Sequence, residues 1–319
     1  MLNKEFVVKS PRAAYGEALK ELGAQNPNIV VLDADLSCST QTKIFAKEFP
    51  ERFFNIGIAE QNLITTAVGL SLTHKIPFAS TFAVFATGRC YDQIRSSVCY
   101  SNANVKIVGT HGGITVGEDG ATHQALEDIS LMRSLPNMNV FSPADYTEVK
   151  AIVKYAASLE APCYIRVPRN NVPTVFNEEK YEFNPHGAVE IYSGTDVLLV
   201  TTGEMLQHSI EACKILDENK IHPKLLHIPQ IKPFSAKNDI IESAKACKHV
   251  VSIENHSVIG GLGSQVAETL SENYPTKLLR IGINDEFGQS GEASELIKFY
   301  GLDSQSIAKK IMEFIKWLF

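Results

Sequence analysis

The sequence predicts an α/β protein with two domains, each built on a mainly parallel sheet flanked by helices. Short runs rich in β-branched residues alternate with longer helical segments, a pattern typical of parallel sheets that are covered on both faces. The alternation stops in a charged, turn-prone segment around Asn177-Glu178-Glu179-Lys180 and then resumes. We therefore expect a first domain over residues 1–176, a linker over 177–187 and a smaller second domain over 188–319.

The first domain should contain three short buried strands and three helices. The first and third helices carry apolar residues at helical spacing, and the third follows the start signal Ser142-Pro143-Ala144-Asp145. The second helix is small and apolar all round. The predicted strands are Ile29–Leu32, Val105–Gly109 and Cys163–Val167, and the predicted helices are Tyr15–Leu22, Asn62–Leu72 and Tyr146–Leu159.

The second domain repeats the alternation of strands and helices without repeating the sequence. A last helical segment, 304–319, ends in apolar residues, and we expect it to pack against its own domain; a subunit contact is the alternative. The predicted strands are Val197–Val200, Lys224–Ile228, His249–Ile253 and Leu278–Ile281, and the predicted helices are Met205–Asn219, Asp239–Ala246 and Ser264–Leu270.

The composition is that of an ordinary enzyme-sized globular protein. The 319 residues are 44% apolar and 21% charged, enough for two cores, and the net charge of −6 argues against a general nucleic-acid-binding surface. No run is long enough to span a membrane and the N-terminus lacks a leader pattern, so we expect a cytoplasmic protein. The six cysteines form no C-x-x-C pair, which predicts reduced, mostly buried thiols.

Glu60 is the most informative single residue. It ends the stretch Phe53–Glu60 and opens an apolar segment, so we expect it to be buried. An unpartnered buried carboxylate costs several kcal/mol, and for that reason it is a candidate for acid–base chemistry. The alternative is a carboxylate that faces the dipole at a helix N-terminus.

Four segments in order resemble transketolase: Phe53–Asn62, Ser80–Phe85, Gly117–Gln124 and Leu135–Met138. The resemblance runs from about Pro11 to nearly the end and covers only the second half of that enzyme, the pyrimidine-binding and C-terminal domains. The Gly-Asp-Gly of the first half, which grips the diphosphate through a metal, does not occur here. The chain thus looks like one subunit of a split enzyme. The resemblance implies a thiamine diphosphate cofactor, with Mg2+ or Ca2+ held by a partner N-terminal subunit.

The same resemblance implies which residues bind the cofactor. Glu60 would share a proton with a nitrogen of the aminopyrimidine ring. Phe82 and Phe85 would line this ring, with Phe85 stacking on it, although two aromatics three apart are more often core residues on one helix face. A further aromatic of the family is replaced by Gly88. Asp35 would lie near the cofactor, or else cap the following turn.

Substrate contacts are implied in the same way. Arg12, Ser39 and Arg169 match positions that hold a sugar phosphate, where converging guanidinium groups are favourable. His111 would approach that phosphate, Asp119 a sugar hydroxyl, and His123 the donor hydroxyls or the transferred unit. The two histidines alone also suit a metal, but no further ligand cluster accompanies them.

Two segments of the second domain are candidates for a further site. Ile259–Ser264 is glycine-rich but lacks G-x-G-x-x-G spacing and a Walker lysine, so we interpret it as a helix start rather than a nucleotide loop. Asp285–Gly291 is likewise a segment of the resembled family, without a clear catalytic group.

These observations favour the C-terminal subunit of a two-chain transketolase that transfers a two-carbon ketol unit between sugar phosphates. Other possibilities are a deoxyxylulose-phosphate-synthase-like enzyme, supported by Tyr91-Asp92-Gln93, a 2-oxoacid dehydrogenase β subunit, and a non-catalytic assembly subunit. A cofactor held between chains requires a permanent interface, and we expect a heterotetramer with two copies of each subunit (α2β2). The segment Leu63–Leu72 is the candidate contact, with no nucleic acid or membrane as partner.

Overall fold

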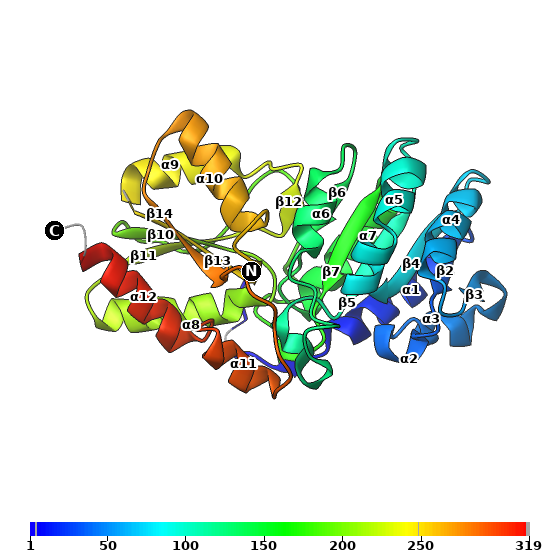
Figure 1. The fold of residues 1–319 in the computed structure, drawn as a ribbon, viewed down its shortest axis with the longest axis horizontal. Coiled ribbons are helices and arrows are strands. Elements are labelled where there is room, and N and C mark those ends of the chain that lie inside the picture. The colour runs from blue at the N-terminus through cyan, green and yellow to red at the C-terminus, as the bar shows by residue number, and fades with distance from the viewer. Residues whose placement is uncertain (4, 248, 317–319) are drawn as a thin grey trace.

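The computed structural model describes residues 1–3, 5–247 and 249–316. Two α/β units lie side by side (Figure 1), one on a seven-stranded sheet with strand order β12-β6-β7-β5-β4-β2-β3 and one on a five-stranded sheet with order β14-β13-β10-β11-β9. Within each sheet most neighbouring strands are parallel. The predicted fold class is confirmed.

The seven-stranded sheet contains the three strands predicted for the first domain and four that were not predicted. β4 was missed because Pro77, which lacks a backbone donor, and the polar Ser80 and Thr81 interrupt its apolar pattern. β3, β6 and β12 have only three residues each. The strands are β2 (Ile29–Asp33), β3 (Phe53–Asn55), β4 (Ile76–Phe82), β5 (Lys106–Thr110), β6 (Asn139–Phe141), β7 (Cys163–Val167) and β12 (Gln230–Lys232).

Helices cover both faces of this sheet. One face packs on α1 (Pro11–Gln25), α3 (Lys43–Glu48) and α7 (Tyr146–Ser158); the other packs on α4 (Glu60–Ser71), the π-helices η2 (Phe85–Arg89) and η3 (Ile94–Cys99), and α6 (Asp128–Ser134). Asp145 caps α7 by accepting a hydrogen bond from the Glu148 amide at 2.9 Å, as the start signal predicts. Shorter elements are α2 (Ser37–Thr40), η1 (Pro50–Arg52), α5 (Tyr91–Gln93) and η4 (Ile114–Asp119).

Two expectations about helix α4 were wrong. It begins at Glu60, two residues earlier than predicted, and it is not buried all round. Leu63, Ile64 and Ala67 face the core, while the opposite side of the helix is open to solvent. Exposed positions on that side are Gln61, Asn62, Thr65 and Gly69.

In the second domain all four predicted strands and all three predicted helices are present. α8 and α12 cover one face of the sheet, and α9 and α10 cover the other (Figure 1). The strands are β9 (Val189–Tyr192), β10 (Val197–Thr201), β11 (Pro223–His227), β13 (Val250–Ser257) and β14 (Leu278–Ile283). The helices are α8 (Met205–Glu218), α9 (Lys237–Cys247), α10 (Leu262–Asn273), α11 (Ala293–Phe299) and α12 (Ser304–Lys316).

The last helix docks on its own domain, as expected. Ile307, Ala308 and Ile311 are fully buried in the core that also contains α8. Residues 317–319 of the predicted apolar end lie outside the described residues.

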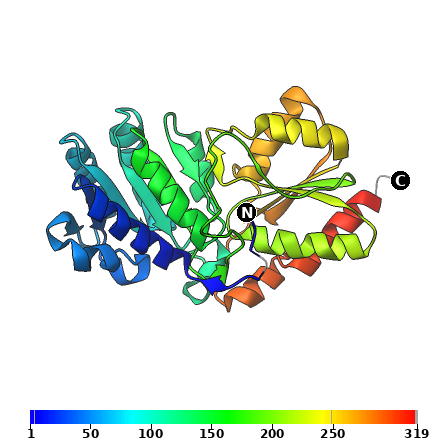
Figure 2. The same cartoon turned by 180° about the vertical axis from the view of Figure 1, so that it is seen from behind.

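The two units are tied together more closely than a flexible linker would allow. Residues 177–188 form neither helix nor strand, yet Tyr181 is buried and donates a hydrogen bond to Glu148. His227 Nε2 of the second unit lies 2.7 Å from the other oxygen of Glu148, with both side chains fully buried. In addition, β12 pairs antiparallel with β6 at the edge of the first sheet. The short strands β1 (Val8–Lys9) and β8 (Val172–Pro173) pair separately. The view from behind shows the two units side by side again (Figure 2).

Five of the six cysteines are buried and all six are free thiols, which confirms the expectation of reduced, mostly buried cysteines. Among the described residues, no helix is long and apolar enough to cross a membrane.

Candidate functional site

Most of the predicted site residues lie at the carboxyl ends of the parallel strands in the first sheet. Asp35 follows β2, Phe82 ends β4, His111 follows β5, and Arg169 comes two residues after β7. Ligands of open α/β sheets bind at this edge because the loops there gather from several strands. The topology therefore collects residues that are more than a hundred positions apart in the sequence.

Glu60 is the first residue of α4 and is buried, with 7% of its surface exposed. Both expectations for it hold: it is a buried carboxylate, and it sits at a helix N-terminus. It is not unpartnered, because Arg89 Nη1 donates a hydrogen bond to its Oε1 at 2.7 Å. Glu60 and Arg89 line a cavity of about 360 Å³ with Ala59, Gln61 and Asn62.

Four rings form a cluster that is linked to Glu60 through Arg89, whose guanidinium carbon lies 4.0 Å from the centre of the Phe85 ring. Phe82 stacks on His111 with ring centroids 3.9 Å apart, and Phe85 lies 5.8 Å from Phe82. The ring of His123 meets Phe85 edge-on at 5.4 Å. The phenylalanines do not share a helix, because Phe82 ends strand β4 and Phe85 begins the π-helix η2. Two π-helices occur in this segment, and π-helical turns are frequent at functional sites.

His111 is held as a neutral imidazole. It is 3% exposed, and its Nδ1 lies 2.8 Å from the hydroxyl of Thr110. Burial lowers the pKa of His111 to about 3, and the nearby Arg12 and Arg169 act in the same direction. This side chain therefore offers a ring nitrogen for hydrogen bonding without a positive charge.

Arg12 and Arg169 converge on one hollow. Arg12 Nε donates to the carbonyl of Arg169 at 2.9 Å, and its Nη1 donates to the carbonyl of Ser39 at 2.8 Å. Arg169 Nη1 donates to Val116 O and pairs with Glu118 Oε2 at 2.9 Å. Burial, together with Arg169, lowers the pKa of Arg12. Both guanidinium groups line a hollow of about 520 Å³.

The hollow is lined by two adjacent cations and by two carboxylates, Glu118 and Glu292. The adjacent guanidinium groups are donors that suit an anionic group. Ser39 participates through its backbone, since its carbonyl accepts from Arg12.

The two aspartates among the predicted site residues, Asp35 and Asp119, are exposed. Asp35 has a positive φ of 64° and its Oδ1 accepts from Asn55 Nδ2 at 2.9 Å. The alternative capping role assigned to Asp35 is wrong: Asp33 accepts from the Leu36 amide and from the hydroxyl groups of Thr40 and Thr42. Asp119 lies exposed at the end of η4, in the glycine-rich loop.

The second domain supports that loop. Gln124, a residue that we did not single out from the sequence, is buried and donates to Gly117 O and to Gln289 O. A Cβ on Gly288 would lie 1.9 Å from Gln124 Oε1, and a Cβ on Gly120 would lie 2.4 Å from Ser290. The segment Asp285–Gly291 therefore acts as a packing partner of the loop.

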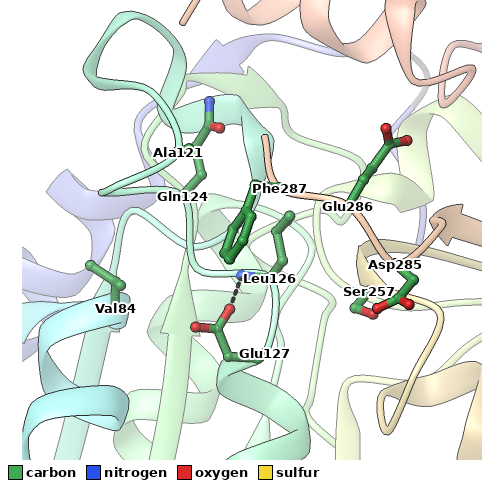
Figure 3. Close-up of a pocket in the computed structure, with 9 residues that line it drawn as sticks. All are labelled: Val84, Ala121, Gln124, Leu126, Glu127, Ser257, Asp285, Glu286 and Phe287. Carbon is green, nitrogen blue, oxygen red and sulfur yellow. Dashed lines mark hydrogen bonds between the residues drawn. The ribbon is translucent and has the colours of Figure 1, made fainter. Parts of the chain in front are cut away.

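A second hollow, of about 370 Å³, lies next to this contact (Figure 3). Val84, the neighbour of Phe85, lines one side of it, and Asp285, Glu286 and Phe287 of the second domain line the other. The Phe287 ring, which is largely exposed, points toward Leu126 in this view.

The glycine-rich segment Ile259–Ser264 is a helix start, as expected. The amides of Leu262 and Gly263 at the beginning of α10 donate to the two carboxylate oxygens of Glu254, each at 2.8 Å. These amides are occupied by a buried side chain, which excludes a phosphate-binding role for them. Within the described residues, no group of three His, Cys, Asp or Glu side chains is arranged to hold a metal.

Comparisons with protein families identify both units. The model of the transketolase pyrimidine binding domain matches residues 9–175, and that of the transketolase C-terminal domain matches residues 187–307.

Three similar proteins cover nearly the whole chain. A putative transketolase C-terminal section from Methanocaldococcus jannaschii is 50% identical over 99% of both chains. Human transketolase is 35% identical over 94% of this chain, which corresponds to 48% of the human protein. A solved structure described as a split gene transketolase, inactive beta4 tetramer, superposes with a TM-score of 0.89 at 50% identity and covers 96% of this chain and 98% of that one. The chain therefore belongs to the transketolase family, as a C-terminal section made of its pyrimidine-binding and C-terminal domains.

Proposed function

We propose that this chain is the C-terminal subunit of a two-chain transketolase that transfers a two-carbon ketol unit between sugar phosphates. The observation that carries the proposal is the line of groups at the sheet edge: a buried carboxyl at a cavity, an aromatic cluster, two histidines, and two arginines at a hollow. This order matches what a cofactor ring, a reacting carbonyl and a terminal phosphate would need in succession.

The residues around Glu60 fit the aminopyrimidine of thiamine diphosphate. A nearly buried carboxyl can share a proton with a ring nitrogen, and Phe85 offers an aromatic face beside it. When bound, thiamine diphosphate supplies a thiazolium carbon that acts as the nucleophile toward the ketose. Glu60 would hold the proton at the ring nitrogen, and Phe82 and Phe85 would exclude water from that side.

The histidines and arginines would bind the sugar. Arg12 and Arg169, with Ser39 nearby, would hold the terminal phosphate through charge-assisted hydrogen bonds. The neutral imidazole of His111 could donate to the same phosphate from its position beside both arginines. His123 would orient the hydroxyl groups of the transferred unit and Asp119 a sugar hydroxyl, because His123 is half-buried and Asp119 is exposed, so both remain accessible to a substrate.

We further propose that a partner N-terminal subunit completes the site and holds the diphosphate with Mg2+ or Ca2+. The surface around Glu60 is open: Cβ atoms added at Gly57 or Gly88 would meet nothing within 4 Å, and the same holds for Gly69 near the other end of α4. The similar solved structure is described as inactive in a beta4 form, which is consistent with a requirement for a second kind of chain. A cytoplasmic role in pentose phosphate conversion is part of this proposal.

We also propose that the chain divides into two domains. We place the boundary within residues 177–187, because no helix or strand lies between residues 177 and 188 and the two family matches are separated at 175 and 187.

The test is reconstitution with the partner subunit, thiamine diphosphate and Mg2+. We expect transfer activity with ketose phosphates and with hydroxypyruvate, and none with pyruvate as donor. Activity with pyruvate would favour the synthase-like or dehydrogenase-like alternatives. Tight cofactor binding and full activity of this chain alone would contradict the split-subunit proposal.

A further inference from the structure

Arg89 contacts the two groups that the proposed function reserves for the cofactor ring. Its Nη1 donates to Glu60 Oε1 at 2.7 Å, and its guanidinium carbon lies 4.0 Å from the centre of the Phe85 ring. One planar group thus hydrogen-bonds the carboxylate and covers an aromatic face at stacking distance.

Arg89 reaches Phe85 because the two residues begin and end η2, four positions apart. Side chains at this spacing lie on the same side of a helix, so Arg89 projects over the Phe85 ring. Gly88, where the resembled family has an aromatic, carries no side chain that could compete for this space, and a Cβ there would meet nothing within 4 Å.

The backbone and the side chain of Arg89 differ in how firmly they are held. The carbonyl of Arg89 accepts a hydrogen bond from Gln61 Nε2 at 3.1 Å, which fixes the end of η2 to α4. The side chain is 52% exposed, and its two described contacts are those with Glu60 and Phe85. The guanidinium group can therefore swing away without moving the helix.

In the proposed function, the aminopyrimidine ring forms a hydrogen bond with Glu60 and stacks on Phe85. The guanidinium group of Arg89 already makes both of these contacts. Two planar groups cannot lie at stacking distance on the same face of one ring. We propose that Arg89 occupies the aminopyrimidine site of the cofactor-free chain and is displaced when the cofactor binds, an inference that rests on the proposed function. Arg89 is then a positioning residue that keeps Glu60 and Phe85 aligned until the cofactor replaces it.

Displacement of Arg89 must lower the apparent affinity for the cofactor. A half-exposed ion pair and one cation–π contact together correspond to about three- to thirtyfold in a binding constant. Part of this penalty is electrostatic, so added salt should reduce it.

The test is calorimetric titration of thiamine diphosphate, with Mg2+ present, into the two-subunit complex carrying wild-type chain or Arg89→Gln. We expect the variant to bind about threefold or more tightly. The ratio of the two affinities should shrink between about 0.05 and 0.5 M salt, because the Debye length falls about threefold over this range. Arg95→Gln is the matched control: Arg95 is exposed, and its side chain makes no hydrogen bond or ion pair with any residue that the structure describes.

Equal or weaker binding by the Arg89→Gln complex, with Arg95→Gln at wild-type affinity, would overturn this inference and leave the proposed function standing. A wild-type complex that fails to bind thiamine diphosphate would remove both. Arg89→Lys keeps the charge but loses the planar stack, and we expect its affinity to lie between those of wild type and Arg89→Gln.

Discussion

The role of a residue at this site depends on its burial and its neighbours as much as on its chemical type. Glu60 and Asp119 are both carboxylates, but the first is buried against Arg89 at a helix N-terminus and the second is exposed on a loop. Likewise His111 is buried and neutral, whereas His123 is half-buried with its Nδ1 2.9 Å from the hydroxyl of Thr122. The proposed roles differ accordingly. Buried Glu60 suits proton positioning and buried His111 a hydrogen bond to the phosphate, whereas His123 and the exposed Asp119 suit contact with sugar hydroxyl groups.

Glu60→Gln should leave the fold almost unchanged, because the amide oxygen can still accept the hydrogen bond from Arg89. An amide cannot share a proton with the cofactor ring, so turnover of the reconstituted complex should fall by about two to four orders of magnitude. Proton exchange at the thiazolium carbon, followed by NMR in D2O, checks the step directly. Exchange at the wild-type rate would show that Glu60 is not the activating group.

Arg169→Ala should act on the substrate phosphate. Loss of one charge-assisted contact costs about 1.5–3 kcal/mol, or roughly ten- to a hundredfold in kcat/KM. Ketose phosphates should show this loss, and hydroxypyruvate, which has no phosphate, should show little. Arg169 also holds the carbonyl of Val116 at 2.6 Å. Equal losses with both donors would mean that supporting this loop is its main role.

His111 makes a pH-dependent contribution to stability. Its pKa falls from 6.5 to about 3 on folding, so below pH 6.5 the unfolded chain binds a proton that the folded chain does not. The contribution of neutral His111 to the free energy of unfolding is fully present above pH 6.5 and is lost as the pH falls toward 3. Between pH 7 and pH 5, the free energy of unfolding measured in urea should fall by about 2 kcal/mol less for His111→Asn than for wild type.

The exposed His74 provides the control for this experiment. His74→Asn should follow the wild-type dependence, and a His111→Asn curve parallel to wild type would contradict a neutral buried imidazole. The change in the free energy of unfolding with pH is compared, rather than its absolute value, because His111→Asn also removes the stacking on Phe82.

At the scale of elements, prediction from the sequence was most successful where periodicity and capping agree. Helix α7 begins as its start signal predicts, and β7 has its predicted bounds. β4 could not be predicted because Pro77 and its polar residues hide a strand that is buried along nearly its whole length. The π-helix η2 leaves no simple sequence pattern, and so the contact between Phe85 and Arg89 was missed. A basic residue four positions after the stacking aromatic is the signal that could have revealed it.

The exposed side of α4 provides a sharper test of assembly than the predicted apolar segment. Val68, in the middle of that segment, packs against the core, so Val68→Asp would disturb folding as well as association. Gly69 is exposed, and a side chain there meets no neighbour within 4 Å. Gly69→Arg should therefore fold normally but prevent binding of the partner subunit, as measured by sedimentation velocity.

Gly69→Ala is the matched control. It should assemble normally and raise stability by about 0.5–1 kcal/mol, because alanine is the better helix former. A Gly69→Arg chain that still forms the full complex would exclude this side of α4 from the interface.

At the scale of the whole molecule, contacts between the two units could not be predicted by local pattern. Pairing of β12 with β6 and the buried contact of His227 with Glu148 join segments about eighty to ninety positions apart. The cause is topological: the chain returns from the second unit to complete the edge of the first sheet. A separate segment after β14 places Gln289 against Gln124, so the second domain also positions a loop that contains predicted substrate residues.

The surface around α4 should be covered by another chain in the assembled complex. Ile58 and Leu72, which flank α4, are 79% and 74% exposed, and the cavity at Glu60 opens beside this helix. Large exposed apolar side chains next to a half-open site indicate a surface that is covered in the functional state. Obligate interfaces bury on the order of 2,000 Å² or more, and twofold symmetry is the commonest closed arrangement. Co-expression with the partner subunit should therefore yield a heterotetramer with two copies of each chain, and a fully active one-to-one complex in sedimentation equilibrium would contradict this.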